Sequence, residues 1–172
     1  MSKLDIPIGA QKRMKRLMDY INTSDTITLN RIYKDVDAFQ NKCVVPVASC
    51  SKGCCACCHV PVEVTRIEAQ FIAKSAHIPM NDLTSNKTRE PDGTPCPLLK
   101  NGICSVYEYR PLACRVFASF DNPLNCLDGK KAHVINTVAS YAPIEYIAGM
   151  LAFVSREENE QAFYADIREW FS

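Results

Sequence analysis

The feature that most constrains this chain is the segment from Cys50 to Cys58, in which five of nine residues are cysteine. Packing alone gives no reason for that density, because a buried cysteine behaves as a small hydrophobe that alanine could replace. A thiolate, in contrast, binds soft transition metals. We therefore expect the fold to be organised around a thiolate metal site. A second group of cysteines supports this expectation, at Cys96, Cys104 and Cys114.

The N-terminal segment does not resemble a secretory signal, because Asp5, Pro7 and the charges of residues 12–16 interrupt its apolar residues. We predict a cytoplasmic protein, in which thiols stay reduced and serve as metal ligands rather than in disulfides. Disulfides remain the alternative for a chain that is exported without such a signal. The longest apolar stretch, residues 142–154, is shorter than the roughly 20 residues that a membrane span needs.

The net charge of +1 by itself identifies no class of partner, and because no overall basicity demands nucleic acid, we do not expect a nucleic-acid partner. The basic residues between Lys12 and Arg16 are read as the solvated face of a helix. We expect no contact with a membrane. We do expect a protein or small-molecule partner, which the sequence does not identify.

The predicted fold class is mainly α with a small β component, a helical scaffold around a cysteine-rich loop and a β-hairpin that form the metal-binding core. The length of 172 residues suits a single domain. We divide it into N-terminal helices (1–45), the cysteine-cluster core (46–128) and C-terminal helices (129–172). Apolar residues at helical spacing, together with a Thr65 to Glu68 capping box, predict the first three helices at 9–22, 28–42 and 66–76.

Within the core, Gly53 is expected to take a positive φ so that the loop can turn its thiols toward one centre. A short strand is predicted at 60–64 and a long loop at 77–95. Asn101-Gly102 lies between apolar runs and predicts a β-hairpin near Cys96 and Cys104. A short helix should follow, with Pro111 at an early position.

The C-terminal part is predicted to be helical. A first stripe contains Val134, Ile135, Val138 and Tyr141. Pro143 opens the next helix, and a Ser155 to Glu158 capping box opens the last. The side chains expected to be buried by these two helices are Ile144, Ile147, Leu151, Phe163, Ile167, Trp170 and Phe171.

The cysteine spacing follows two motifs, C-x3-C-x2-C-C from Cys50 and C-P-L-L-x4-C-S-V-Y-E-x-R-P-L-x-C-R from Cys96. Over about residues 50–118 the chain resembles the zinc- or iron-chelating cysteine-cluster proteins, also called the YkgJ family. Three cysteines, Cys43, Cys55 and Cys126, lie outside the pattern, and we expect one of them, with Cys126 as the first choice, to complete an even ligand set. The ligands that the resemblance implies are Cys50, Cys54, Cys57, Cys58, Cys96, Cys104 and Cys114.

The family description leaves the metal open. Zinc would need two closed four-thiolate sites. The staggered spacing of Cys50, Cys54 and Cys57, with a fourth cysteine from the second group, favours an iron–sulfur cluster over Zn2+. Neighbouring side chains diverge in extended backbone, so we expect Cys57 and Cys58 to bind different metal atoms, in one polynuclear centre or in two centres. The alternative is that only one of the two cysteines binds metal.

Two cations next to the ligand positions, Arg110 and Arg115, are expected to offset the thiolate charge and contact the cofactor. His59 is a further candidate ligand through nitrogen. No residue is assigned a catalytic role from the sequence.

Three functions remain open, and they differ in whether the protein is an enzyme. The first is a metal-binding protein whose site organises the fold. The second is an iron–sulfur-dependent protein-modifying enzyme, because flagellin lysine N-methylases resemble longer proteins with a similar cysteine region. The third is a zinc-stapled interaction module. A thioredoxin-like role for Cys54 and Cys57 is disfavoured because no βαβ pattern surrounds them, and a radical S-adenosylmethionine enzyme because no alternating strands follow.

Overall fold

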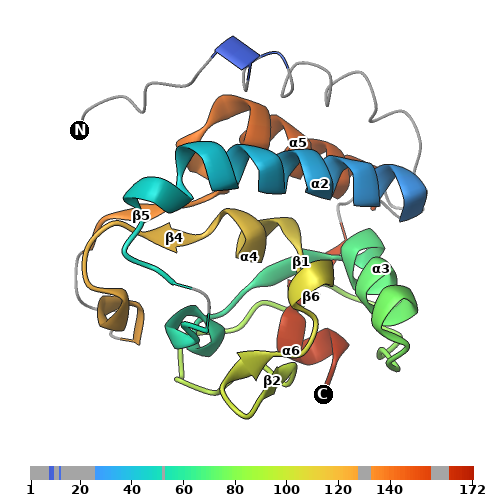
Figure 1. The fold of residues 1–172 in the computed structure, drawn as a ribbon. Helices are drawn as coiled ribbons and strands as arrows, with labels where there is room; N and C mark the ends of the chain where they lie inside the picture. Colours follow the sequence, from blue (N-terminus) through green and yellow to red (C-terminus); the bar gives the residue numbers. More distant parts are fainter. Residues whose placement is uncertain (1–7, 10–11, 13–25, 52, 128–132, 156–162) are drawn as a thin grey trace.

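The computed structural model describes residues 8–9, 12, 26–51, 53–127, 133–155 and 163–172. Over these residues the fold is mainly α-helical with small sheets of two strands each, which confirms the predicted fold class. Two long helices, α2 (Thr26–Cys43) and α5 (Ala142–Val154), lie together at the top of Figure 1. The hairpin of β2 (Leu99–Lys100) and β3 (Ile103–Cys104) lies at the opposite end with α6 (Ile167–Trp170).

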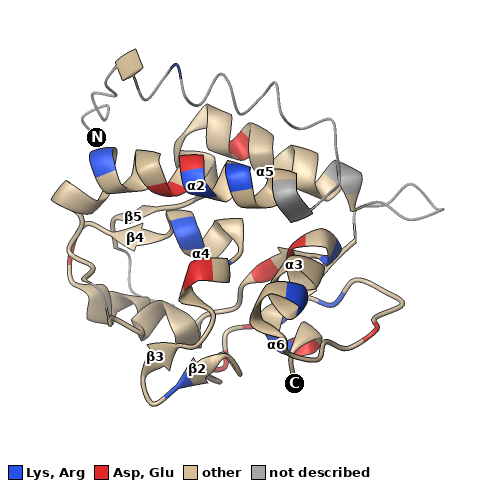
Figure 2. Ribbon diagram, turned by 45° about the vertical axis from the view of Figure 1, so that its right-hand side comes forward, with Lys and Arg blue, Asp and Glu red and all other residues tan. Residues whose placement is uncertain are grey.

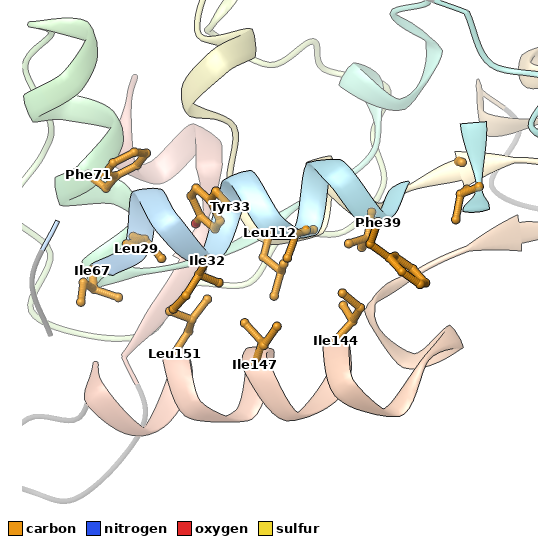
Figure 3. Close-up of a cluster of buried hydrophobic side chains, with 14 of the residues drawn as sticks. Leu29, Ile32, Tyr33, Phe39, Ile67, Phe71, Leu112, Ile144, Ile147 and Leu151 are labelled. Atoms are coloured by element: carbon orange, nitrogen blue, oxygen red, sulfur yellow. The ribbon is translucent and has the colours of Figure 1, made fainter. Parts of the chain in front are cut away.

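The first hydrophobic cluster fills the space between α2 and α5. Figure 3 shows Ile144, Ile147 and Leu151 of α5 pointing toward α2. From α2 the cluster receives residues at helical spacing, so the predicted period of the second helix is confirmed. The members contributed by α2 include Leu29, Ile32, Tyr33, Val36 and Phe39.

The helix α3 (Arg66–Ala76) joins this cluster to a second one. It begins with the predicted Thr65 to Glu68 capping box and buries Phe71 in the first cluster and Ile72 in the second. The second cluster also contains Trp170, whose Nε1 donates to the carbonyl of Val64 at 3.0 Å. One helix therefore connects the two halves of the apolar interior.

A buried carboxylate links α3 to the helices on either side. Glu68 is only 4% exposed and accepts hydrogen bonds on both of its oxygens. Oε1 accepts from the hydroxyl of Tyr33 and from the backbone N–H of Leu112, each at 2.8 Å. Oε2 accepts from the N–H and the hydroxyl of Thr65 at 3.1 and 2.7 Å. Because α4 (Leu112–Val116) carries one ligand candidate, this carboxylate positions part of the cysteine region.

The C-terminal segment differs from the sequence prediction. Its last helix is only the four-residue α6, and the residues before it form β6 (Tyr164–Asp166), antiparallel to β1 (Glu63–Thr65). The single long helix predicted after Ser155 is therefore wrong, although its capping residue Glu158 lies outside the described residues. Pairing with a strand about a hundred residues away overrides the local helical pattern. The four predicted apolar side chains are nevertheless buried: Phe163, Ile167, Trp170 and Phe171.

The prediction of a helix at residues 134–141 is also wrong. It forms β5 (Ile135–Asn136), which pairs with β4 (Ala118–Ser119), and then the 3₁₀ helix η5 (Val138–Ser140). The buried Asn136 side chain explains the conformation, because its amide donates to the carbonyl of Val116 at 2.6 Å. Most of the helix predicted at 9–22 lies outside the described residues.

Charged residues of both signs are interspersed in the described part of the chain. Figure 2 shows basic and acidic residues along α2 without separation into patches of one sign. Of the helices described, none combines the length and the apolar character needed to span a bilayer.

The hydrogen bonds of Glu68 lead to the first testable prediction. In Glu68→Gln the amide nitrogen can donate but cannot accept, so two of the four donors lose their acceptor in either amide orientation. We expect the free energy of unfolding, measured by urea titration, to fall by about 1–3 kcal/mol. The matched change Glu90→Gln, at an exposed loop position, should have little effect. Equal stability of the two variants would contradict the role given to Glu68.

Candidate metal centre

The first cysteine group begins in a loop and ends in a short helix. Gly53 has a φ of +94°, as predicted for the turn. Cys50 is hydrogen-bonded to β4, because its Sγ accepts a hydrogen bond from the N–H of Ser119 at 3.1 Å. Cys57 and Cys58 lie in the 3₁₀ helix η2 (Ala56–His59), so the extended backbone expected for them is wrong. A 3₁₀ helix has three residues per turn, so the side chains of Cys57 and Cys58 still point in directions about 120° apart.

The second group is held by the predicted hairpin. Asn101 and Gly102 take positive φ values of 51° and 75°, as a two-residue hairpin turn requires. Cys104 lies on β3 opposite Leu99, whose N–H donates to the carbonyl of Cys96 at 2.9 Å. Cys96 therefore lies in the turn that precedes the hairpin. Cys114 comes from α4, the short helix that Pro111 precedes.

One backbone hydrogen bond joins the two groups directly. The N–H of Cys96 donates to the carbonyl of Cys58 at 2.7 Å. Cys126 reaches the same region from the 3₁₀ helix η4 (Pro123–Leu127), which packs against η2 and buries this cysteine. The fold thus gathers cysteines from four separate segments.

Most of these cysteines surround a cavity of about 970 Å³. The rest of its lining is largely apolar and includes Val62, Leu98 and Phe117. Cys50 and Cys126 do not border this cavity. The cysteines that line it are Cys54, Cys57, Cys58, Cys96, Cys104 and Cys114.

All ten cysteines are free thiols, and some of them make contact in pairs. Cys50 hydrogen-bonds to Cys54, and Cys57 to Cys58. Among the described residues, no group of three or more His, Cys, Asp or Glu side chains has an arrangement that could hold a metal ion. The sulfurs therefore lie around a common space without converging on one point.

Burial and mutual repulsion keep most of these thiols protonated in the absence of metal. Burial, followed by the charge of Cys57, raises the pKa of Cys114 well above its usual value. The same two causes raise the pKa of Cys126 to about 11. Cys57 is the exception: a hydrogen bond from Cys58 and the nearby Arg110 cation lower its pKa to about 7. A metal must therefore displace protons from most of its ligands.

The two predicted cofactor cations have different surroundings. Arg110 borders the cavity, its guanidinium lies 3.7 Å from the ring centre of Tyr107, and its charge lowers the pKa of Cys57, Cys104 and Cys114. Arg115 is outside the cavity lining. Its buried guanidinium pairs with Asp37, donates to the carbonyls of residues 108 and 110, and lies 4.2 Å from the ring centre of Tyr33.

The remaining candidates lie around the first group. The Nδ1 of His59 is 3.2 Å from the carbonyl oxygen of Cys55. Cys55 is the N-cap residue of η2, and Cys43 is buried in the first hydrophobic cluster. Neither of these two cysteines borders the cavity.

Arg168 is a residue that sequence reasoning missed. Its guanidinium is buried and donates to the carbonyls of Cys58 and Val60 at 3.2 Å, and to that of Thr94 at 2.7 Å. It also pairs with the buried carboxylate of Asp166, which accepts the N–H of Val62 at 2.8 Å. The segments that carry Cys58 and Cys96 are thus held by one side chain from the C-terminus.

A sequence signal for this pair does exist. Asp166 and Arg168 are oppositely charged residues two positions apart in the segment from Phe163 to Phe171, whose other residues are apolar or aromatic except Glu169. Charged residues that are buried are almost always paired, so two opposite charges in such a segment indicate an internal interaction. Nothing local indicates that its partners are the cysteine segments.

The arrangement defines a cysteine-rich domain with soft metal-binding donors. The family model CxxCxxCC, described as a putative zinc- or iron-chelating domain, matches residues 49–138, slightly more than half of the chain. The chain belongs to this family, which is the one that its cysteine spacing predicted. No curated protein and no solved structure matches the chain.

The contacts of Arg168 generate the second prediction. Arg168→Ala leaves the buried Asp166 without its cation and removes the donor from the carbonyls of both cysteine segments. We expect the free energy of unfolding, measured by urea titration, to fall by about 3–5 kcal/mol.

Arg31→Ala, at an exposed position of α2, is the matched control and should change stability little. Arg168→Lys keeps the charge but lacks the planar fork, so it should recover only part of the loss. If Arg168→Lys had the stability of the wild type, charge alone would matter. That result would contradict the role given to the hydrogen bonds from the guanidinium to the backbone carbonyls.

Proposed function

We propose that this protein binds an iron–sulfur cluster in the cavity, through thiolates drawn from both cysteine groups. The observation that carries the proposal is that six cysteines from segments far apart in sequence line one cavity. The other two predicted ligands, Cys50 and Cys126, do not border the cavity and would have to reach the cluster from beside it. The candidate ligands that line the cavity are Cys54, Cys57, Cys58, Cys96, Cys104 and Cys114.

The donor set fits such a group. Thiolates suit both zinc and iron–sulfur clusters. A single ion needs its sulfurs at bonding distance around one point, whereas a cluster brings its own iron and sulfide and occupies more space. No three of the described thiols are arranged to hold one ion, and they surround a cavity of about 970 Å³, so the cluster is favoured over zinc. When bound, the cluster supplies a covalent cross-link and a centre for electron transfer.

The protein's own residues prepare this site. Arg110 adds positive charge beside the thiols, which offsets the negative charge of several thiolates. The apolar lining limits the access of water. Arg168 fixes the backbone of the segments that carry Cys58 and Cys96. We propose the cytoplasm as the location, because the cysteine ligands must remain reduced.

Elemental analysis and an acid-labile sulfide assay on anaerobically purified protein test the proposal. We expect iron and sulfide in similar amounts. Cys114→Ser should lower both and reduce the melting temperature, because it removes a ligand candidate that lines the cavity and metal binding contributes folding energy.

The control is Cys55→Ser, which changes a cysteine of the same loop that does not border the cavity. It should retain the iron and sulfide of the wild-type protein. If the assays find zinc but no sulfide, the protein binds zinc and the cluster proposal is wrong. If freshly purified protein contains neither metal nor sulfide, metal binding itself is refuted.

A further inference from the structure

We propose that the part of the cavity that the cysteines do not line binds one uncharged, mainly apolar organic molecule. The inference rests on the proposed function only in taking the cluster to occupy the cysteine side of the same cavity. Three features of the cavity point to such a ligand: its extent, the interactions of its polar side chains, and the residues at its mouth.

The cavity extends well beyond the cysteines. Its lining includes Ala148 and Leu151 of α5 as well as Ile103 of the β2–β3 hairpin. Figure 1 shows α5 and this hairpin at opposite ends of the molecule, so the cavity reaches from one to the other. The sequences of four lining elements, β1, β6, η5 and α5, contain no cysteine. A substantial part of the lining is therefore free of sulfur donors.

The volume of the cavity is larger than a cluster needs. At about 970 Å³ it lies at the upper end of the range of roughly 300–1,000 Å³ that is typical of small-molecule sites. A cluster of four irons and four sulfides is far smaller than the drug-sized ligands that such sites enclose. With a cluster at the cysteines, space for an organic molecule remains next to it.

The charged side chains inside the cavity already have partners. Glu68 accepts hydrogen bonds on both oxygens, and Asp166 is paired with Arg168. Arg89 pairs with carboxylates that lie outside the cavity lining. Arg110 adds its positive charge beside the thiols. A charged group of a ligand would therefore be buried without a partner, which is costly, whereas an uncharged ligand avoids this cost.

The exposed residues of the lining mark where the cavity opens. Ile103 is 63% exposed and Tyr107 is 41% exposed, although both are large side chains that also line the cavity. An apolar molecule that enters here would remove part of their surface from water, which is favourable. The exposed carboxylate of Glu108, next to Tyr107, disfavours an anion at the same opening. The mouth thus favours the same kind of ligand as the interior.

Isothermal titration calorimetry on anaerobically purified full-length protein tests the site, with iron and sulfide measured in the same samples. The probes are 1-naphthol, which is uncharged at neutral pH, and 1-naphthoate, which joins the same ring system to a carboxylate. We expect saturable binding of 1-naphthol. Binding of 1-naphthoate should be at least about tenfold weaker, because its carboxylate loses hydration without gaining a partner.

Two substitutions fill the cysteine-free part of the cavity from different elements. Ala148→Phe and Val138→Phe each place an aromatic ring in the space that the ligand needs. Each should weaken 1-naphthol binding at least about tenfold and leave iron and sulfide at wild-type levels. The matched control is Ala142→Phe, at an exposed position of α5 outside the lining, which should bind as the wild type does. Melting temperatures establish that the variants are folded.

The outcomes separate this site from the cluster. Absence of saturable 1-naphthol binding in the wild type would overturn the site, while the iron and sulfide assay decides the cluster separately. Unchanged binding in both filled variants would place the probe elsewhere and would also overturn the site. Equal affinity for the two probes would overturn the assignment of an uncharged ligand. Binding that both substitutions weaken, in protein without iron or sulfide, would support the site and refute only the cluster.

Discussion

The cysteine region depends on the hydrogen bonds that the guanidinium of Arg168 donates to backbone carbonyls. A buried guanidinium is costly unless its charge is paired and its donors are satisfied. Asp166 supplies the charge, and carbonyls of both cysteine segments accept the remaining donors. These bonds are charge-assisted and therefore stronger than neutral ones. The C-terminal residues, which lie beyond the matched residues 49–138, consequently belong to the architecture of the site.

The arrangement also explains how metal binding would couple to folding. The scaffold brings mostly half-buried thiols around a cavity at the junction of the two hydrophobic clusters, since Cys96 and Cys104 pack against the second while Leu112 of α4 belongs to the first. Burial alone keeps such thiols neutral, and a metal makes their ionisation favourable. Metal binding would therefore cross-link the two halves of the interior as it displaces the protons.

Local signals predicted much of this structure. The Thr65 to Glu68 capping box and the Asn101-Gly102 turn each act within a few residues, so their geometry could be derived from the sequence. The spacing of the cysteines identified the family for a similar reason. In contrast, the strand β6 depends on β1, and the partners of Arg168 lie in segments brought near only by the fold. The proximity of Cys126 to η2 likewise depends on tertiary packing that no local pattern encodes.

The most direct test of the central claim is anomalous X-ray diffraction from crystals of anaerobically purified protein, recorded at the iron and zinc absorption edges. The account predicts an iron signal inside the cavity, bordered by sulfurs of η2, α4 and the β2–β3 hairpin, with no zinc signal in its place. A map without metal signal near these cysteines, or with their sulfurs joined as disulfides, would contradict it.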